Sequence, residues 1–90
     1  MSSTNNENKQ LRLGNNIRKF RFENNELSQL ELANAVGVTR LTIHSIETGN
    51  FNPSVSLALR IARFFDKPLE DVFFLYYEWK EPDIWIKQSA

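Results

Sequence analysis

Two predicted helices, over residues 28–36 and 39–48, are separated by a very short turn in this sequence. Gly37 ends the first helix, because glycine readily adopts the left-handed conformation that closes a helix. Only Val38 intervenes before Thr39, whose hydroxyl can cap the start of the second helix. So short a turn holds two helices at a steep angle. The sequence therefore predicts a helix-turn-helix unit.

Apolar residues at helical spacing predict three more helices, over residues 15–23, 55–65 and 68–77. Pro82 prevents continuation of the last helix, and the alternating segment 83–88 predicts a short strand. Residues 1–10 contain nothing to bury and are expected to form a disordered arm. The domain itself is expected over residues 11–77, with residues 78–90 as a C-terminal extension. The fold expected is all-α, with five helices.

Composition excludes several kinds of protein. The chain has 90 residues, which allows one domain, and its formal net charge is zero. It has no cysteine and a single histidine, so we expect no disulfide, no metal site and no cofactor. No set of nucleophile and base is evident, so we expect no enzyme. The polar N-terminus and the short apolar runs predict a cytoplasmic protein without a membrane partner.

The helix expected over residues 39–48 sorts its side chains into two faces. At about 100° per residue, Ile43 and Ile46 lie within about 40° of Thr39 and point to the core. The opposite arc carries a mixed set of outward residues: Arg40, Leu41, His44, Ser45 and Thr48. This outer face is therefore free to contact a partner.

The outward side chains suit recognition of double-stranded DNA. Arg40 offers a bidentate fork for guanine or a clamp for phosphate. Leu41 could pack against a thymine methyl group, and His44 and Ser45 can exchange hydrogen bonds with base edges. Gln29 lies at the start of the preceding helix, where backbone N–H groups bind phosphate.

The stretch QLELANAVGVTRLTIHSIETGNFNPS resembles the Cro/repressor-type (XRE-like) family of helix-turn-helix DNA-binding proteins. The segment SLALRIARFFDKPLEDVF resembles the fourth and fifth helices of small members of that family. The resemblance implies a five-helix domain with its third helix in the major groove. It implies base contacts by Thr39, Arg40, Leu41, His44 and Ser45. It implies phosphate contacts by Gln29, Gly49 and Asn50.

Cations on the other predicted helices have less specific roles. Arg18 and Lys19 are either ordinary surface residues or further phosphate contacts. Arg60 and Arg63 are expected on a solvated face rather than on a second DNA patch.

Glu47 lies about 80° round its helix from Thr39, at the edge of the buried face. A partly buried carboxylate needs a partner, and Arg21 is the expected one. The family resemblance suggests the same pair. We therefore expect a structural ion pair between Arg21 and Glu47, rather than a DNA contact by Arg21.

The run VFFLYYEW has too many aromatic residues for an ordinary surface. Either these residues enlarge the core, or they form a dimer interface, which is the interpretation we favour. The interface residues expected are Phe74, Tyr77, Trp79, Ile84, Trp85 and Ile86. A strand at residues 84–86 could pair with residues 11–13 and add a short two-stranded antiparallel sheet from the terminal segments.

These patterns leave three hypotheses for function. The first is a homodimeric repressor that binds a palindromic operator, because two half-sites match a two-fold protein. The second is an antitoxin-like module that binds an unknown protein partner through its C-terminus and regulates its own promoter. The third is an adaptor without DNA binding, suggested by the zero net charge and by Leu41, since this position is often polar in the family.

Overall fold

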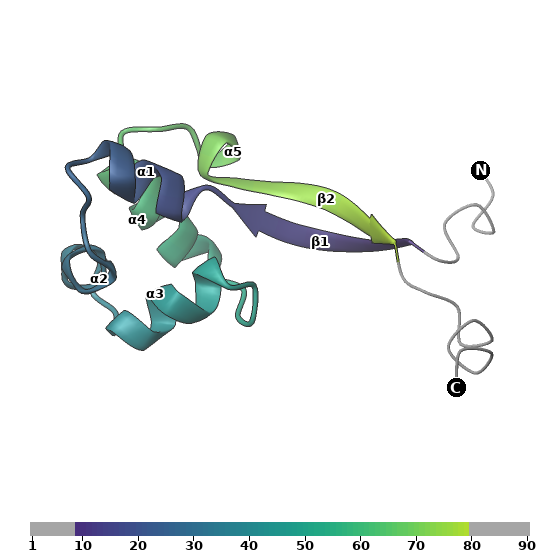
Figure 1. Cartoon of the computed structure of the whole chain (residues 1–90), viewed down its shortest axis with the longest axis horizontal. Coiled ribbons are helices and arrows are strands. Elements are labelled where there is room, and N and C mark those ends of the chain that lie inside the picture. The colour runs from purple at the N-terminus through teal and green to yellow at the C-terminus, as the bar shows by residue number, and fades with distance from the viewer. Residues whose placement is uncertain (1–8, 80–90) are drawn as a thin grey trace.

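The computed structural model describes residues 9–79. Its five helices gather at one end, and its two strands form a ribbon that extends away from them (Figure 1). We call residues 17–72 the helical body and the two strands the ribbon. The elements in chain order are β1 (Lys9–Asn15), α1 (Ile17–Glu23), α2 (Gln29–Val36), α3 (Arg40–Glu47), α4 (Val55–Phe64), α5 (Leu69–Val72) and β2 (Phe73–Trp79).

Local capping explains where three of the helices begin. The hydroxyls of Ser28, Thr39 and Ser54 each accept a hydrogen bond from the backbone N–H three residues later. At Ser28 the capping box is complete, because its own N–H donates to the Glu31 carboxylate at 2.9 Å. That backbone hydrogen bond, with the one from the Ser28 hydroxyl, holds the pKa of the Glu31 carboxyl below its usual value. The predicted cap of α3 at Thr39 is confirmed.

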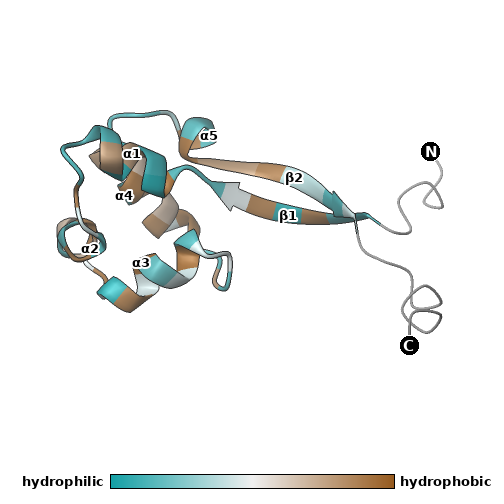
Figure 2. Ribbon diagram, in the orientation of Figure 1, coloured by the Kyte–Doolittle hydropathy of each residue, from teal (hydrophilic) through white to brown (hydrophobic). Residues whose placement is uncertain are grey.

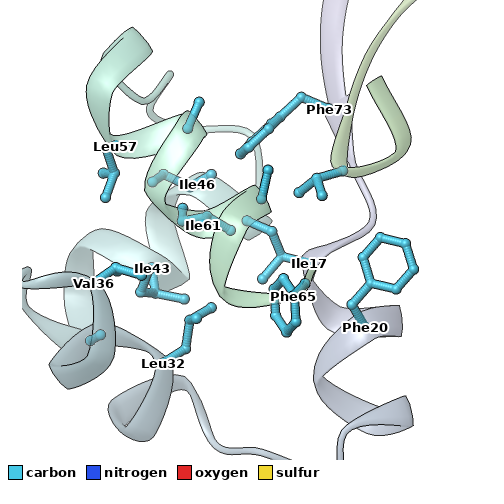
Figure 3. Close-up of a cluster of buried hydrophobic side chains, with 14 residues drawn as sticks. Ile17, Phe20, Leu32, Val36, Ile43, Ile46, Leu57, Ile61, Phe65 and Phe73 are labelled. Atoms are coloured by element: carbon cyan, nitrogen blue, oxygen red, sulfur yellow. The ribbon is translucent and has the colours of Figure 1, made fainter. Parts of the chain in front are cut away.

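The core consists of fourteen buried apolar side chains, and all but one of them belong to the helical body (Figure 3). Ile17, Leu32 and Ile61 come from three different helices and are fully buried. Among residues 9–79, Phe73, the first residue of β2, is the only core residue outside the body. The helices therefore pack around one small core, which positions α3 on its surface. Within residues 9–79, no helix is long and apolar enough to cross a membrane.

The two strands form an antiparallel sheet, which corrects two predictions. The fifth helix does not reach Tyr77, because α5 ends at Val72 and β2 follows at once. Aromatic residues fit the pleated surface of a sheet, and β1 supplies the backbone partner that this run needs. Leu11 and Leu13 pair with Tyr77 and Leu75, rather than with residues 84–86.

Five helices with a two-stranded sheet make the expected all-α description correct only in part. β1 begins at Lys9, so residues 9 and 10 of the expected arm belong to a strand. The strand predicted over residues 83–88 and the remainder of the arm, residues 1–8, lie outside the described residues.

Candidate nucleic-acid interface

The turn between α2 and α3 sets the direction of α3. Gly37 takes a left-handed conformation, with φ of 81°, and its N–H donates to the Ala33 carbonyl at 2.9 Å. The small side chain of Ala33 is fully buried, so the two helices can approach closely. Thr39 then caps α3. This arrangement is the predicted helix-turn-helix unit.

The two faces of α3 differ sharply in exposure. Ile43 is fully buried and Ile46 nearly so, whereas Leu41 exposes 62% of its surface. Arg40 and His44 are also exposed, while Ser45 is half-buried. The face predicted to contact DNA is therefore the solvent face of α3, and its largest exposed apolar group is Leu41.

Arg40 is held in place by a side chain from α2. Its guanidinium Nη1 donates to Gln29 Oε1 at 3.1 Å. The Nε2 of Gln29 donates in turn to Glu47 Oε1 at 3.1 Å and lies 3.4 Å from His44 Nδ1. Gln29 thus connects α2 with three residues of α3. The sequence predicts only a phosphate contact for Gln29. In the structure its side-chain amide is bonded within the protein.

The Arg21–Glu47 ion pair fixes α3 against α1. Arg21 Nε donates to Glu47 Oε2 at 2.7 Å, and Nη2 donates to Oε1 at 3.2 Å. Arg21 Nη1 also donates to the carbonyl of Leu27 at 2.7 Å. The two side chains expose only 12% and 8% of their surfaces. The structure therefore brings together the two residues expected to pair, with bidentate geometry and little solvent.

A shallow hollow lies between α1, α2 and α3, beside this ion pair. Its lining consists of Asn15, Arg18, Arg21, Phe22, Gln29, His44, Glu47 and Thr48. Among residues 9–79, Arg18 makes no salt bridge, and its guanidinium lies 5.5 Å from the Phe22 ring centre. Lys19 does not line the hollow, since it lies about 100° further round the helix, near the Phe20 ring. Arg18 is thus better placed than Lys19 to meet a phosphate beside α3.

In the loop after α3, the backbone N–H groups of Gly49 and Asn50 already make hydrogen bonds within the protein. Gly49 has φ of 83°, and its N–H donates to the Ile46 carbonyl at 3.1 Å. The Asn50 N–H donates to the Ser45 carbonyl at 2.9 Å. Both N–H groups are therefore engaged within the protein. The exposed side chain of Asn50 is the remaining donor for a phosphate.

Arg60 has a structural role that the sequence did not reveal. Its guanidinium Nη1 donates to the carbonyl of Val36, at the carboxyl end of α2. Arg60 is exposed, as expected, and it also satisfies one of the carbonyls that a helix end leaves free. The two residues are far apart in the chain, so no local sequence signal reports the contact. Arg63 is exposed, as expected.

The ribbon separates residues that were expected to share one interface. Tyr77 and Trp79 lie on one face of the sheet, and Phe74 lies on the other, because side chains alternate along a strand. The other three expected interface residues, Ile84, Trp85 and Ile86, lie outside the described residues. Within residues 9–79, no group of three His, Cys, Asp or Glu side chains is arranged to hold a metal ion.

A capped helix with a buried apolar face and an outward polar face, held across a tight turn, defines a DNA-binding helix-turn-helix domain. The chain belongs to the XRE family of helix-turn-helix proteins, whose model matches residues 17–72. It is thus a transcriptional regulator with a helix-turn-helix DNA-binding domain.

Several relatives are similar over most of their length. An uncharacterized HTH-type transcriptional regulator of Archaeoglobus fulgidus is 43% identical over 72 residues, covering 80% of this chain and 94% of the relative. The regulator MJ0272 of Methanocaldococcus jannaschii is 44% identical over 59 residues, covering 66% and 88%. The regulator YgzD of Bacillus subtilis is 49% identical over 51 residues, covering 57% and 77%.

Proposed function

We propose that this regulator is a sequence-specific, dimeric repressor that inserts α3 into the major groove of its operator. The observation that carries the proposal is the exposed face of α3, on which Arg40 is held by Gln29 at 3.1 Å. An arginine held in one orientation loses less conformational freedom on binding than a free one, which favours contact with one particular base. The rest of α3 is fixed by the buried Ile43 and by the Glu47 ion pair.

The proposed base contacts follow the outer face of α3. Arg40 suits guanine O6 and N7, and Leu41 suits a thymine methyl group. The remaining base contacts are proposed at Thr39, His44 and Ser45. Phosphate contacts are proposed at Arg18, Lys19, Gln29, Gly49 and Asn50, with Arg18 and Asn50 best supported by their positions. At Gln29 and Gly49, the phosphate would have to share an N–H donor that already makes a hydrogen bond within the protein.

Repression follows from occupancy in this proposal. A two-fold dimer places two copies of α3 on half-sites about one helical turn apart, so its operator is a palindrome. A dimer bound across a promoter excludes the polymerase from the same DNA. Whether the protein represses or activates is tested separately from DNA binding, by comparing reporter expression with and without the protein.

The experiment that tests DNA recognition is selection of preferred duplexes from a random library by the purified full chain. We expect a palindromic sequence with half-sites about one turn apart. The affinity for the selected duplex should fall steeply as salt rises, because bound phosphates release counterions. Absence of binding to any duplex at low salt would overturn the proposal and favour the adaptor hypothesis.

Arg40→Ala refines the test at one base pair. We expect the variant to lose about 1–3 kcal/mol of discrimination at a single position of each half-site, while other positions keep their preferences. Competition binding with the four possible bases at that position measures the loss. Uniform weakening on all duplexes would instead identify Arg40 as a phosphate contact. Arg63→Ala, which removes an exposed arginine from α4, is the matched control and should leave the preferences unchanged.

A further inference from the structure

The register of the ribbon gathers its apolar side chains on one face. Directly paired residues of neighbouring strands point to the same side of a sheet. The pairs Leu11–Tyr77 and Leu13–Leu75 therefore share a face, and Trp79, paired with Lys9, continues it. We call Leu11, Leu13, Leu75, Tyr77 and Trp79 the aromatic face. Four of these five side chains, all but Leu13, expose between 52% and 68% of their surface.

The opposite face of the ribbon has a different character. Arg12 and Glu78 form an ion pair there at 3.6 Å, next to Gln10. Phe74 lies over Gly14, so closely that a Cβ on Gly14 would stand 2.5 Å from its ring. Phe74 thus fills the space above a glycine of its own sheet. The aromatic face has no comparable cover among the described residues.

The ribbon receives little support from the rest of the molecule. Only its base joins the core, through Phe73 and the half-buried Leu13. Beyond the base it projects away from the helices, with apolar segments along both strands (Figures 1 and 2). A two-stranded sheet by itself is marginally stable in water and needs further strands or a packed face. The ribbon therefore needs a further surface to pack against.

We propose that the aromatic face packs against the same face of a second copy of this chain. The inference rests on the proposed function only in that both require a dimer. Each face offers two large aromatic and three leucine side chains, so two faces together bury on the order of 1,000 Å², about the lower limit for a specific interface. Within residues 9–79, the one charged residue that the register places beside the aromatic face is Lys9, at its outer end next to the Trp79 ring, so little charge loses its hydration.

Packing face to face explains the pattern better than pairing of strand edges. Edge pairing would extend the sheet to four strands and would leave all four exposed side chains of the aromatic face in water. Stacking removes them from water and leaves the Arg12–Glu78 pair and Gln10 outside. It also excludes Phe74 from the interface, although Phe74 belongs to the same aromatic run.

Two neighbouring tyrosines provide a matched test. Tyr77 lies on the aromatic face, Tyr76 lies on the opposite one, and both are exposed. We expect Tyr77→Ser in the full chain to raise the dimer dissociation constant at least about tenfold, because it removes a large apolar group from the interface. Tyr76→Ser should change it by less than about twofold. Analytical ultracentrifugation measures both, and circular dichroism checks that each variant is folded.

Three outcomes would overturn the inference. A monomeric wild-type chain at all accessible concentrations would mean that another occupant covers the face. Equal effects of the two substitutions would indicate edge pairing, or a general loss of the ribbon. A Tyr77→Ser variant that remains as dimeric as the wild type would show that the dimer, if formed, uses another surface.

A half-site duplex separates this inference from the proposed function. Tyr77→Ser should bind a single half-site as the wild type does, because α3 is unchanged, but should lose affinity for the full palindrome. A wild-type dimer that binds no duplex would leave the inference standing and overturn the proposed function. A wild-type monomer that binds half-sites would overturn the inference and the dimeric part of the proposed function, but would leave DNA recognition by α3 standing.

Discussion

The helical body and the ribbon stabilise themselves by different means. Thirteen of the fourteen core residues lie in the body, whereas the ribbon contributes only Phe73. The body buries a contiguous core, although it also exposes single apolar side chains such as Leu41 and Val55, whereas most apolar side chains of the ribbon are exposed. A body of this kind can fold by its own packing. The ribbon, in contrast, acquires most of its stability from what it contacts.

Ion pairs show the same contrast. The body holds Arg21 and Glu47 at 2.7 Å with 12% and 8% exposure, and the ribbon holds Arg12 and Glu78 at 3.6 Å with 40% and 53%. Solvent screens the second pair and barely reaches the first. The family model matches the body, residues 17–72, whereas the similarity to the Archaeoglobus fulgidus relative spans 72 residues and so extends beyond the body. Nearly all of the buried core that lets a domain fold by its own packing lies in the body.

The largest effect is expected from breaking the ion pair of the body. Glu47→Gln leaves the guanidinium of Arg21 buried without a charge partner, so the free energy of unfolding should fall by about 3–5 kcal/mol. Urea denaturation near neutral pH measures this change. The double variant Arg21→Met/Glu47→Leu removes both charges and should recover most of the loss. A loss under about 1 kcal/mol for Glu47→Gln would mean that solvent reaches the pair.

A slightly smaller effect is expected from the core. Ile43→Ala opens a cavity in the body and should cost about 3 kcal/mol of unfolding free energy. Leu75→Ala removes a similar volume from the ribbon, where the side chain is mostly exposed, and should cost less than about 1 kcal/mol in the dilute chain. Thermal unfolding at low protein concentration compares the two. Similar losses for both variants would refute the distinction between the two regions.

The ion pair of the ribbon should matter little. We expect Glu78→Gln to change the free energy of unfolding by less than about 0.5 kcal/mol, because exposed pairs are screened by water and salt. Denaturation at low and high salt should show little difference between this variant and the wild type. A loss as large as that of Glu47→Gln would show that the ribbon is more rigid than its exposure indicates.

The smallest effect concerns the capping box of α2. Hydrogen bonds from Ser28 hold the pKa of the Glu31 carboxyl below its usual value in the folded chain, so the carboxylate favours folding above that usual value. This contribution is lost as the pH falls through the lowered pKa, because protonation removes the acceptor charge. Glu31→Gln should therefore be less stable than the wild type near neutral pH, and the difference should vanish in acid. Unfolding curves between about pH 7 and about pH 2 test this.

Much of the helical body could be predicted from the sequence, because its signals are local. Ser28, Gly37 and Thr39 fix the ends of α2 and the start of α3 within a few residues of themselves. The helical period alone placed Ile43 inside and Leu41 outside. The Arg21–Glu47 pair was expected from the same angular argument and from the family resemblance.

The ribbon could not be predicted in the same way. The run from Phe73 to Trp79 is short and apolar, and periodicity alone does not separate a helix from a strand in such runs. Its conformation is decided by β1, whose residues are about sixty positions earlier in the chain. A strand so far away in the chain does not change the local hydrophobic pattern of residues 73–79. The sequence therefore predicts that the fifth helix continues through them.

Side-chain contacts between helices were equally hidden. Arg60 reaches the end of α2, and Gln29 reaches Arg40, only because the helices cross at particular angles. The sequence showed that these residues were polar and outward. It did not show that the Gln29 side chain also bonds to Arg40 and Glu47 within the protein.

The hydrogen bond from Arg40 to Gln29 bears on how such regulators diverge. Exchange of Arg40 removes the hydrogen-bond partner of Gln29 Oε1, and Gln29 is also bonded to Glu47, so a change at position 40 affects two further side chains. Leu41 is exposed and free of this chain of bonds, so it can be replaced alone. On the proposed base contacts, a duplicated copy of this protein would therefore change its operator with less disturbance to its own side chains through position 41 than through position 40.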